Sequence, residues 1–329
     1  MANQPSNLLI KLSQRLFPEP GERDAFVEAL VHPQEFASTI LWTRPRPEGD
    51  FLPKELPLPW QPEWVDRLSS ATRPGQHPLH EQGYFYCLDF SSVFAASALS
   101  GIAAPTPTVL DLCAAPGGKS LFAWRALQPE QLWCNEVVRK RVRILISNLK
   151  RCGATSALVF NQDPSAFAEQ MPRSASLVLV DAPCSGQSLL AKGETALGCF
   201  HPVNLNKNAN RQKRILANAA EVVAGQGYLA YMTCTFSPEE NEQVCEWFLG
   251  KFPQFQPVSV TPLAAYPSHL ADWPCYRLWP QSGLGAGAFT ALFRNTGDEA
   301  LAVNPDFLKQ HGMILYTAEG GTVENRSNE

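Results

Sequence analysis

The sequence predicts an α/β fold, in which a parallel sheet carries helices on both faces and follows a small N-terminal α+β appendage. From about residue 105 to about residue 297, short apolar segments alternate with longer segments of helical periodicity, as is typical of such a sheet. Before residue 80, clustered proline and tryptophan interrupt regular elements. We therefore expect an appendage over residues 1–75, a main domain over 76–297 and a partly disordered tail over 298–329.

The individual elements are expected in a regular order along the chain. The appendage has helical patterns at residues 7–16 and 22–30, and its segment 43–80 is expected to be irregular or to form short edge strands. The strands expected in the main domain are 108–112, 132–135, 157–160, 177–180 and 228–232. The helices expected there are 119–127, 138–151, 204–224 and 239–249. Ligands bind such sheets beyond the carboxyl ends of the strands, so the residues that follow each strand are the candidates for a ligand-binding site.

Composition excludes several classes of protein. The chain has 329 residues, of which 45% are hydrophobic and 18% charged, and no apolar stretch is long enough to span a membrane. The N-terminus is polar and has no signal-peptide pattern. Nine cysteines are spread irregularly without a CxxC pair, which argues against a disulfide framework or a zinc site. We expect a cytoplasmic protein without a metal.

The charge of the chain is weakly informative. A net charge of −4 disfavours a nucleic-acid partner, although binding depends on local patches rather than on the total. Basic residues cluster at 139–143, 150–151 and 207–214. Each cluster by itself is more typical of a solvated helix face.

The segment 111–119 (Asp-Leu-Cys-Ala-Ala-Pro-Gly-Gly-Lys) lies where the first strand of the main domain passes into its helix. Glycines let the backbone approach a ligand, and the start of a helix presents free N–H groups, a combination that suits a nucleotide-like cofactor. The dinucleotide motif GxGxxG is absent. The phosphate-binding motif GxxxxGK[ST] is not met either, because Cys113 stands where that motif requires glycine.

Two acids follow the next two strands. Glu136 is placed where a carboxylate can hold a ribose diol, and Asp163 is placed where one can receive an adenine amino group. Alone, each is more typical of a helix cap or a surface residue. Together, at successive strand ends, they favour a ligand that contains adenosine.

Two further strand ends carry cysteine, in segments 181–186 (Asp-Ala-Pro-Cys-Ser-Gly) and 233–241 (Thr-Cys-Thr-Phe-Ser-Pro-Glu-Glu-Asn). One such cysteine would most often be structural, but Cys184 and Cys234 at two strand ends, with Asp181 beside them, indicate covalent catalysis. A thiolate that adds to C6 of cytosine activates C5 for methylation. This chemistry needs a cysteine of lowered pKa, an acid at N3 of the base and a group that helps release. Asp181 suits the N3 contact if it is protonated or shares a proton with the base.

These three motifs, in this order and spacing, resemble those of the RNA cytosine-C5 methyltransferases of the Fmu/Sun type, over roughly residues 75–295. The resemblance implies a Rossmann-like class I methyltransferase sheet, S-adenosyl-L-methionine as cofactor, and methylation of ribosomal or transfer RNA. It also implies that Cys234 is the nucleophile, that Cys184 assists release, and that Lys119 and Asp181 lie in the catalytic pocket. The cofactor-binding residues that it implies are Cys113, Ala114, Ala115, Pro116, Gly117, Gly118, Lys119, Glu136, Arg141, Asp163 and Asp181.

The resemblance extends to the segments 83–92 and 277–293, but the chain departs from the family at several positions. Leu88 stands where glutamine is common, and Thr235 replaces the serine that usually follows the nucleophile. The family's Arg-Arg-x-Pro-Asp stretch is replaced by residues 187–201, so no substrate contact is carried over there. We expect the N-terminal region and the insertion 187–210 to contribute to RNA recognition, and the protein to act as a monomer.

Two other functions remain open. A DNA cytosine-C5 methyltransferase would use the Pro-Cys pair at Cys184, but it would need a separate target-recognition domain and a Glu-Asn-Val motif, and neither is visible in the sequence. A non-catalytic RNA-binding or assembly factor could keep the same fold. Every catalytic position is filled, however, which favours an enzyme.

Overall fold

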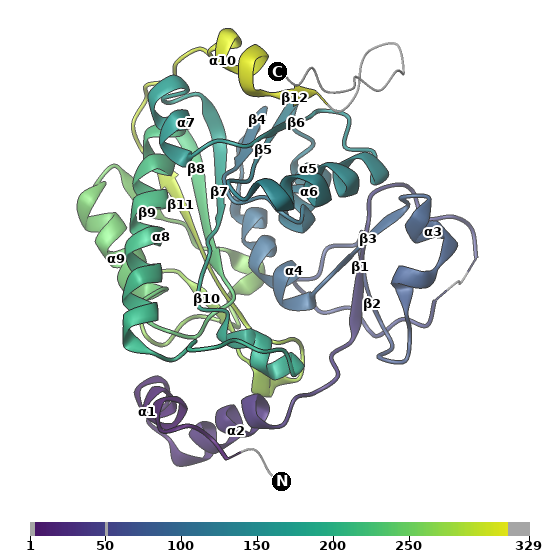
Figure 1. Ribbon diagram of the computed structural model, residues 1–329, viewed down its shortest axis with the longest axis vertical. Coiled ribbons are helices and arrows are strands. Elements are labelled where there is room, and N and C mark those ends of the chain that lie inside the picture. The colour runs from purple at the N-terminus through teal and green to yellow at the C-terminus, as the bar shows by residue number, and fades with distance from the viewer. Residues whose placement is uncertain (1–3, 50–51, 315–329) are drawn as a thin grey trace.

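The computed structural model describes residues 4–49 and 52–314 (Figure 1). The last part of the expected tail, residues 315–329, lies outside the described residues. Within the described ranges, no helix is long and apolar enough to cross a membrane, and no cluster of His, Cys, Asp or Glu is suited to hold a metal ion.

A nine-stranded sheet forms the centre of the molecule, with the order β10-β11-β8-β7-β4-β5-β6-β12 and with β9 paired to β11. Strands β6, β5, β4, β7 and β8 are parallel, whereas β9, β10, β11 and β12 join antiparallel. The strands are β4 (Thr108–Asp111), β5 (Gln131–Asn135), β6 (Ala157–Phe160), β7 (Ala175–Asp181), β8 (Val223–Thr233), β9 (Phe255–Pro257), β10 (Tyr276–Leu278), β11 (Ala288–Asn295) and β12 (Met313–Ile314).

Helices cover both faces of this sheet, as the sequence predicts. Alternate strand residues point to opposite faces, so Val109 packs in one apolar core and Leu110 in the other. The first core includes residues of α4 (Phe90–Ala96), α5 (Gly118–Leu127) and α6 (Arg139–Arg151). The second includes residues of α7 (Pro164–Gln170), α8 (Pro202–Val222), α9 (Glu242–Lys251) and α10 (Pro305–His311).

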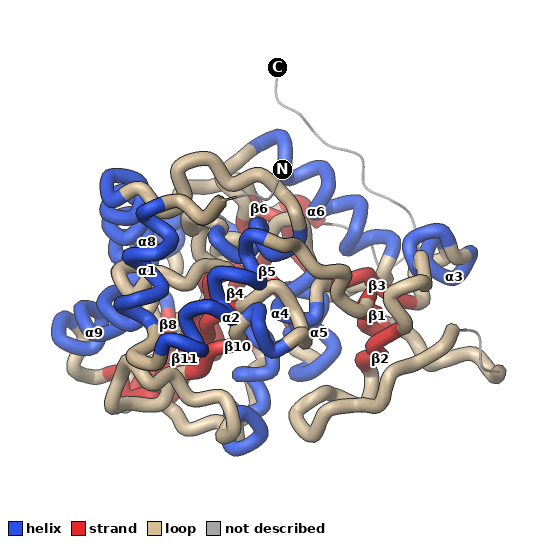
Figure 2. Tube along the Cα trace, turned by 90° about the horizontal axis from the view of Figure 1, so that it is seen from below, coloured by secondary structure: helices blue, strands red, loops and turns tan. Residues whose placement is uncertain are grey.

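The N-terminal part consists of a helix pair and a small sheet. Helices α1 (Asn7–Leu16) and α2 (Pro20–Val31) lie close to their expected positions. The small sheet has the order β2-β1-β3, built from β1 (Ser38–Trp42), β2 (Val65–Leu68) and β3 (Phe85–Leu88), with α3 (Pro78–Glu81) beside it. It lies to one side of the main sheet (Figure 2). Its third strand comes after residue 75, so residues 1–75 do not complete this sheet by themselves.

Two regions differ from the pattern expected from the sequence. The short helix α7 was not expected; Asp163 caps its first turn and Pro164 occupies its first position. The first part of the expected tail, for which the sequence indicated no regular elements, forms α10 and β12. Phe307 of α10 packs against Phe160 and Phe167, with ring centroids 6.0 and 5.3 Å away, and β12 pairs with β6. Phe307, together with Leu308 and Met313, which pack against the two cores, anchors this segment to the main sheet.

Candidate active site

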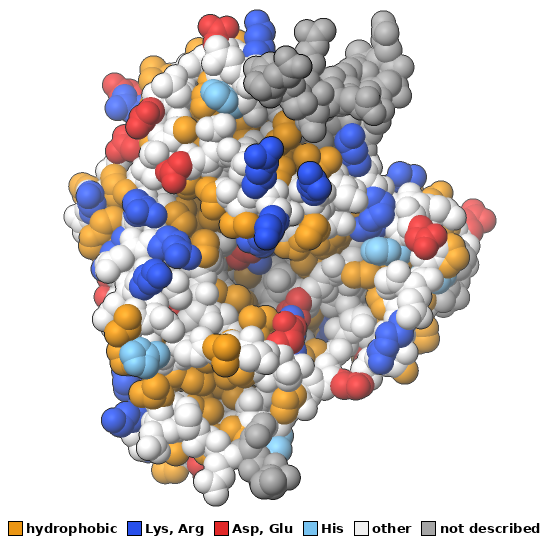
Figure 3. Space-filling view, viewed as in Figure 1, with side chains coloured by type: hydrophobic (Ala, Val, Ile, Leu, Met, Phe, Trp, Pro, Cys, Tyr) orange, Lys and Arg blue, Asp and Glu red, His pale blue; other side chains and the backbone are white. Residues whose placement is uncertain are grey.

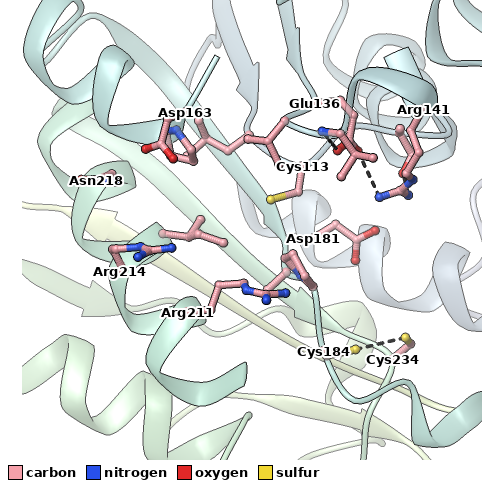
Figure 4. Close-up of a pocket in the computed structure, with 18 of the residues that line it drawn as sticks. Cys113, Glu136, Arg141, Asp163, Asp181, Cys184, Arg211, Arg214, Asn218 and Cys234 are labelled. Carbon is pink, nitrogen blue, oxygen red and sulfur yellow. Dashed lines mark hydrogen bonds and ion pairs between the residues drawn. The ribbon is translucent and has the colours of Figure 1, made fainter. Parts of the chain in front are cut away.

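A cavity of about 570 Å³ opens at the carboxyl ends of the parallel strands (Figure 4). This is the edge of the sheet where ligands bind in this class of fold. The lining residues singled out from the sequence are Cys113, Ala115, Glu136, Arg141, Asp163, Asp181, Cys184 and Cys234. The remaining candidates, which are not among its lining residues, are Ala114, Pro116, Gly117, Gly118 and Lys119.

Gly117 and Gly118, which follow β4, are explained by the local backbone conformation and by close packing. Gly117 precedes α5 with φ +114°, which a residue with a side chain rarely adopts. A Cβ on Gly118 would lie 2.5 Å from Leu88 Cδ1, so this glycine lets α5 approach β3. Downstream, Ser120 donates to Asp111 over 2.6 Å, and Lys119 is bound to Asp181. Lys119 and Ser120 are therefore already engaged by aspartates, whereas a phosphate-binding loop needs these two side chains free to bind the phosphates and their metal ion.

Glu136 is buried at the end of β5, with both carboxylate oxygens engaged. Oε1 accepts from the N–H of Val138 over 2.8 Å, and Oε2 pairs with Arg141 Nη1 at 3.1 Å. Arg141 also donates to the carbonyl of Ala115. Arg141 thereby ties Glu136 to the loop after β4 and fixes the shape of this side of the cavity.

Asp163 has two roles at the opposite side of the cavity. Its Oδ1 accepts from the N–H of Ser165 over 3.0 Å, and this hydrogen bond is the main reason that the pKa of Asp163 lies below its usual value. The residue also lines the cavity. Asp163 therefore both caps α7 and lines the cavity.

Asn135 was not singled out from the sequence, although it holds the strand ends together. Its buried amide donates to the carbonyls of Leu112 and Gln162 and accepts from the N–H of Gln162. A polar residue at the end of an otherwise apolar strand is the signal that could have identified it.

Lys119 and Asp181 form an ion pair beside the cysteines, with Nζ 2.7 Å from Oδ2. Burial lowers the pKa of Lys119, but the charge of Asp181 and its hydrogen bond outweigh burial, so the pKa lies above its usual value. Lys119 is therefore a cation that orients the Asp181 carboxylate at the edge of the cavity.

The sulfurs of Cys184 and Cys234 lie 3.2 Å apart, beyond the ends of the adjacent strands β7 and β8. Cys234 is exposed and Cys184 is half-buried. The hydrogen bond between them lowers the pKa of Cys234, helped by Lys119 and opposed by burial and by Asp181. The same hydrogen bond, together with burial, raises the pKa of Cys184 well above its usual value. The pair therefore favours a thiolate on Cys234 that accepts a hydrogen bond from the Cys184 thiol.

Partly or fully buried hydrogen bonds link the two cysteine loops to each other. Glu240 Oε2 accepts from the N–H of Ser185 and from the amide of Gln212, both over 2.9 Å. Gln212 also donates to the carbonyl of Pro183, and the hydroxyls of Ser185 and Thr235 are 2.7 Å apart. Thr235, a departure from the family, thus makes the cross-loop contact that a serine hydroxyl could also make.

The segment 187–201 and the two N-terminal helices contact the loop that carries Cys234. Gln187, fully buried, donates to the carbonyl of Cys199 and accepts from the N–H of Phe236, both over 2.9 Å. The ring of Phe236 meets that of Phe26 of α2 at 5.1 Å between centroids. Arg15 of α1 pairs with Glu239 at 2.7 Å.

Helix α8 contributes residues to the cavity that the sequence did not single out. Arg211, Arg214, Ile215 and Asn218 line it opposite the loop after β4. Figure 4 shows the two arginine side chains extending from α8 into the cavity. Both belong to the basic cluster 207–214, whose sequence pattern indicates only a solvated helix face.

Solved structures with a similar fold come from Pyrococcus horikoshii. One, described as a methyltransferase homolog protein, has a TM-score of 0.68 at 22% identity and covers 88% of this chain and 99% of its own. Another, NSun6 with SFG, has a TM-score of 0.69 at 18% identity and covers 89% and 99%. These likenesses confirm the expected methyltransferase fold.

Curated relatives are similar over part of their length. Ribosomal RNA small subunit methyltransferase F of Pectobacterium carotovorum is 33% identical over 201 residues, which are 60% of this chain and 42% of the relative. The protein of the same name from Escherichia coli is 32% identical over 257 residues, 76% of this chain and 53% of the relative. The chain thus spans about half the length of the curated relatives it matches. The family model described as 16S rRNA methyltransferase RsmB/F matches residues 103–294, more than half of the chain and all three motifs, and so the chain belongs to this family.

Proposed function

We propose that this protein transfers a methyl group from S-adenosyl-L-methionine to C5 of a cytosine in RNA, through a covalent bond between Cys234 and C6 of the base. The observation that carries the proposal is the pair of sulfurs 3.2 Å apart, in which the exposed Cys234 has the lowered pKa. Only the thiolate is a nucleophile, and the lowered pKa of Cys234 supports the assignment of the nucleophile that the family resemblance implies.

The cavity fits the cofactor in size and in the chemistry of its donors. Its volume of about 570 Å³ lies in the range of small-molecule sites. Glu136 would hold the ribose diol and Asp163 the adenine amino group, while the loop at Cys113–Gly118 would face the remainder of the molecule. When bound, S-adenosyl-L-methionine supplies the methyl group as an electrophile.

In the proposed reaction, the thiolate of Cys234 forms a bond to C6 of cytosine, and the displaced electron pair makes C5 nucleophilic. N3 of the adduct takes up a proton from water, and Asp181 accepts the hydrogen bond of that N–H while Lys119 keeps its carboxylate oriented; the N3 proton returns to water when the thiolate leaves. After methylation, the C5 proton leaves to water and the bond between C6 and Cys234 breaks. Cys184, whose sulfur lies 3.2 Å from that of Cys234, donates its S–H hydrogen bond to the departing sulfur.

The test is to change each cysteine separately and to look for a protein–RNA adduct that survives denaturing electrophoresis. We expect Cys184→Ala to accumulate the adduct, because release is slowed, and Cys234→Ala to form none. Loss of the adduct in Cys184→Ala alone would instead support the DNA-methyltransferase reading of Cys184. Absence of S-adenosyl-L-methionine binding by calorimetry would favour a non-catalytic assembly factor.

The names of the relatives support a substrate class. We propose ribosomal RNA of the small subunit, acted on by a monomer in the cytoplasm, with residues 76–297 as the catalytic part and residues 1–75 and 187–210 assisting recognition. Bisulfite sequencing of total RNA from a deletion strain identifies the cytosine. If the deletion strain loses methylation only in transfer RNA, the substrate is transfer RNA and not ribosomal RNA.

A further inference from the structure

Two arginines in the cavity have no carboxylate partner. Arg211 and Arg214 are exposed on α8, and neither forms a hydrogen bond or an ion pair with any residue in the described ranges. Arg214 acts on Asp163 only as the smallest of several causes of its lowered pKa. Three residues apart on a helix, the two side chains lie on the same face, about 5–6 Å apart at Cβ.

Two of the three acids of the site are already paired with cations. Glu136 pairs with Arg141 and Asp181 pairs with Lys119. Asp163 accepts the hydrogen bond that caps α7, and it leaves one carboxylate for the two arginines. The cofactor would not neutralise the two arginines, because it carries a sulfonium and an ammonium against one carboxylate and is a net cation. With the cofactor bound, the α8 side of the cavity therefore has an excess of positive charge.

The surface around the cavity is also rich in positive charge. Figure 3 shows a hollow in this face of the molecule with Lys and Arg side chains beside it. Exposed basic residues lie on α6, at Arg139, Lys140 and Arg143, across the cavity from α8. The net charge of −4 thus conceals a basic region around the site.

We infer that Arg211 and Arg214 bind a backbone phosphodiester of the RNA beside the nucleotide that enters the cavity. The inference rests on the proposed function. A planar guanidinium can bind a phosphate through two parallel hydrogen bonds, and such contacts fix the register of a nucleic acid without reading its sequence. The pair would hold the backbone while the base reaches Cys234, so its role is positioning.

The experiment compares Arg211→Gln/Arg214→Gln with the charge-matched control Lys213→Gln/Lys251→Gln. The control lysines lie over the ring of Trp247 at 5.7 and 5.5 Å, and neither lines the cavity. The probes are unmodified 16S ribosomal RNA, titrated at several salt concentrations, and S-adenosyl-L-methionine, titrated by calorimetry. An unchanged melting temperature shows that each variant is folded.

We expect the arginine variant to bind RNA about tenfold more weakly, with the slope of log K against log salt reduced by roughly 0.7 for each lost phosphate contact. Cofactor affinity should stay within about twofold, and the control should change neither quantity comparably. Arg211→Lys/Arg214→Lys should restore the slope but only part of the affinity.

Two results overturn the inference. If cofactor affinity falls while the salt slope stays the same, the pair binds the carboxylate of the cofactor. If the arginine and control variants behave alike, no phosphate site exists here. Both are independent of the proposed function, whose failure appears in Cys184→Ala, with Arg211 and Arg214 intact, as absence of the Cys234 adduct.

Discussion

At the scale of single residues, the two cysteines of the candidate site differ in pKa because of the hydrogen bond between them. The Cys184 thiol lowers the pKa of Cys234, and its own pKa rises in return. Eight other cysteines share the chain with Cys234, and most are buried with raised pKa values. Contact with a neighbour, rather than residue type, distinguishes the candidate nucleophile.

Removing that donor gives the first prediction. In Cys184→Ala, the pKa of Cys234 should rise, so the pH midpoint for alkylation by iodoacetamide, followed on the peptide that contains Cys234, should move upward. Cys113→Ser is the control, because Cys113 lines the same cavity without a hydrogen bond to Cys234. An unchanged midpoint in Cys184→Ala would contradict the assignment of the thiolate.

Asp111 gives a prediction about stability. Burial raises its pKa to about 7, although the Ser120 hydroxyl opposes the shift, whereas an unfolded aspartate titrates near about 3.9. The folded state therefore binds the proton more tightly. The stability linked to this proton is full below the unfolded pKa and is lost as the pH rises through the folded one.

Between about pH 5 and pH 8, the wild-type protein should lose about 3 kcal/mol of unfolding free energy relative to Asp111→Asn, by linkage. Asparagine can keep the bonds to Ser120 and to the N–H of Cys113 without a titrating proton. Urea unfolding of both proteins across this range measures the difference. Parallel stability curves would show that Asp111 does not titrate there.

At the scale of elements, α2 supports the loop after β8. Phe26 is fully buried and its ring meets those of Phe17, Phe236 and Trp279. Phe26→Ala should cost about 3–5 kcal/mol in urea unfolding, because an aromatic core residue is removed. Adduct formation at Cys234 should also slow, since Phe236 loses its partner. Leu8→Ala, at an exposed position of α1, should change both little.

Helix α8 shows where sequence patterns stop being informative. The sequence predicts the helix at residues 204–224, and the structure has it at Pro202–Val222. Its orientation depends on Gln212, a polar residue that is fully buried because it pairs with Glu240. A pattern of apolar residues would have placed Gln212 in solvent. With Gln212 inside, Arg211 and Arg214 turn toward the cavity.

At the scale of the whole molecule, the alternation of strands and helices was sufficient to predict the parallel sheet and the edge that carries the site. Strand ends identified Glu136, Asp163, Asp181 and both cysteines because the fold brings all carboxyl ends together. The small sheet was not predictable as a unit, because β3 follows β2 only after a proline-containing turn and α3. Such pairing depends on contacts distant in sequence.

Cofactor binding should stabilise the whole molecule. At about 100 times its dissociation constant, a ligand adds roughly 2.7 kcal/mol, so S-adenosyl-L-methionine should raise the melting temperature by several degrees. Glu136→Gln should reduce this rise, because a carboxylate partner of the ribose is lost. Glu169→Gln, an exposed change on α7 outside the cavity, should leave it intact. An equal rise in melting temperature in both variants would show that Glu136 does not contribute to cofactor binding.

The strands that close the main sheet, β10 and β12, are very short and both pair antiparallel with their neighbours. A long open edge strand offers unpaired N–H and C=O groups to which another chain can add. Met313–Ile314 covers part of β6, which would otherwise be such an edge. A chain shortened before residue 305 would expose that backbone together with the apolar surface under Phe307. It should self-associate on heating at concentrations where the longer chain stays dispersed.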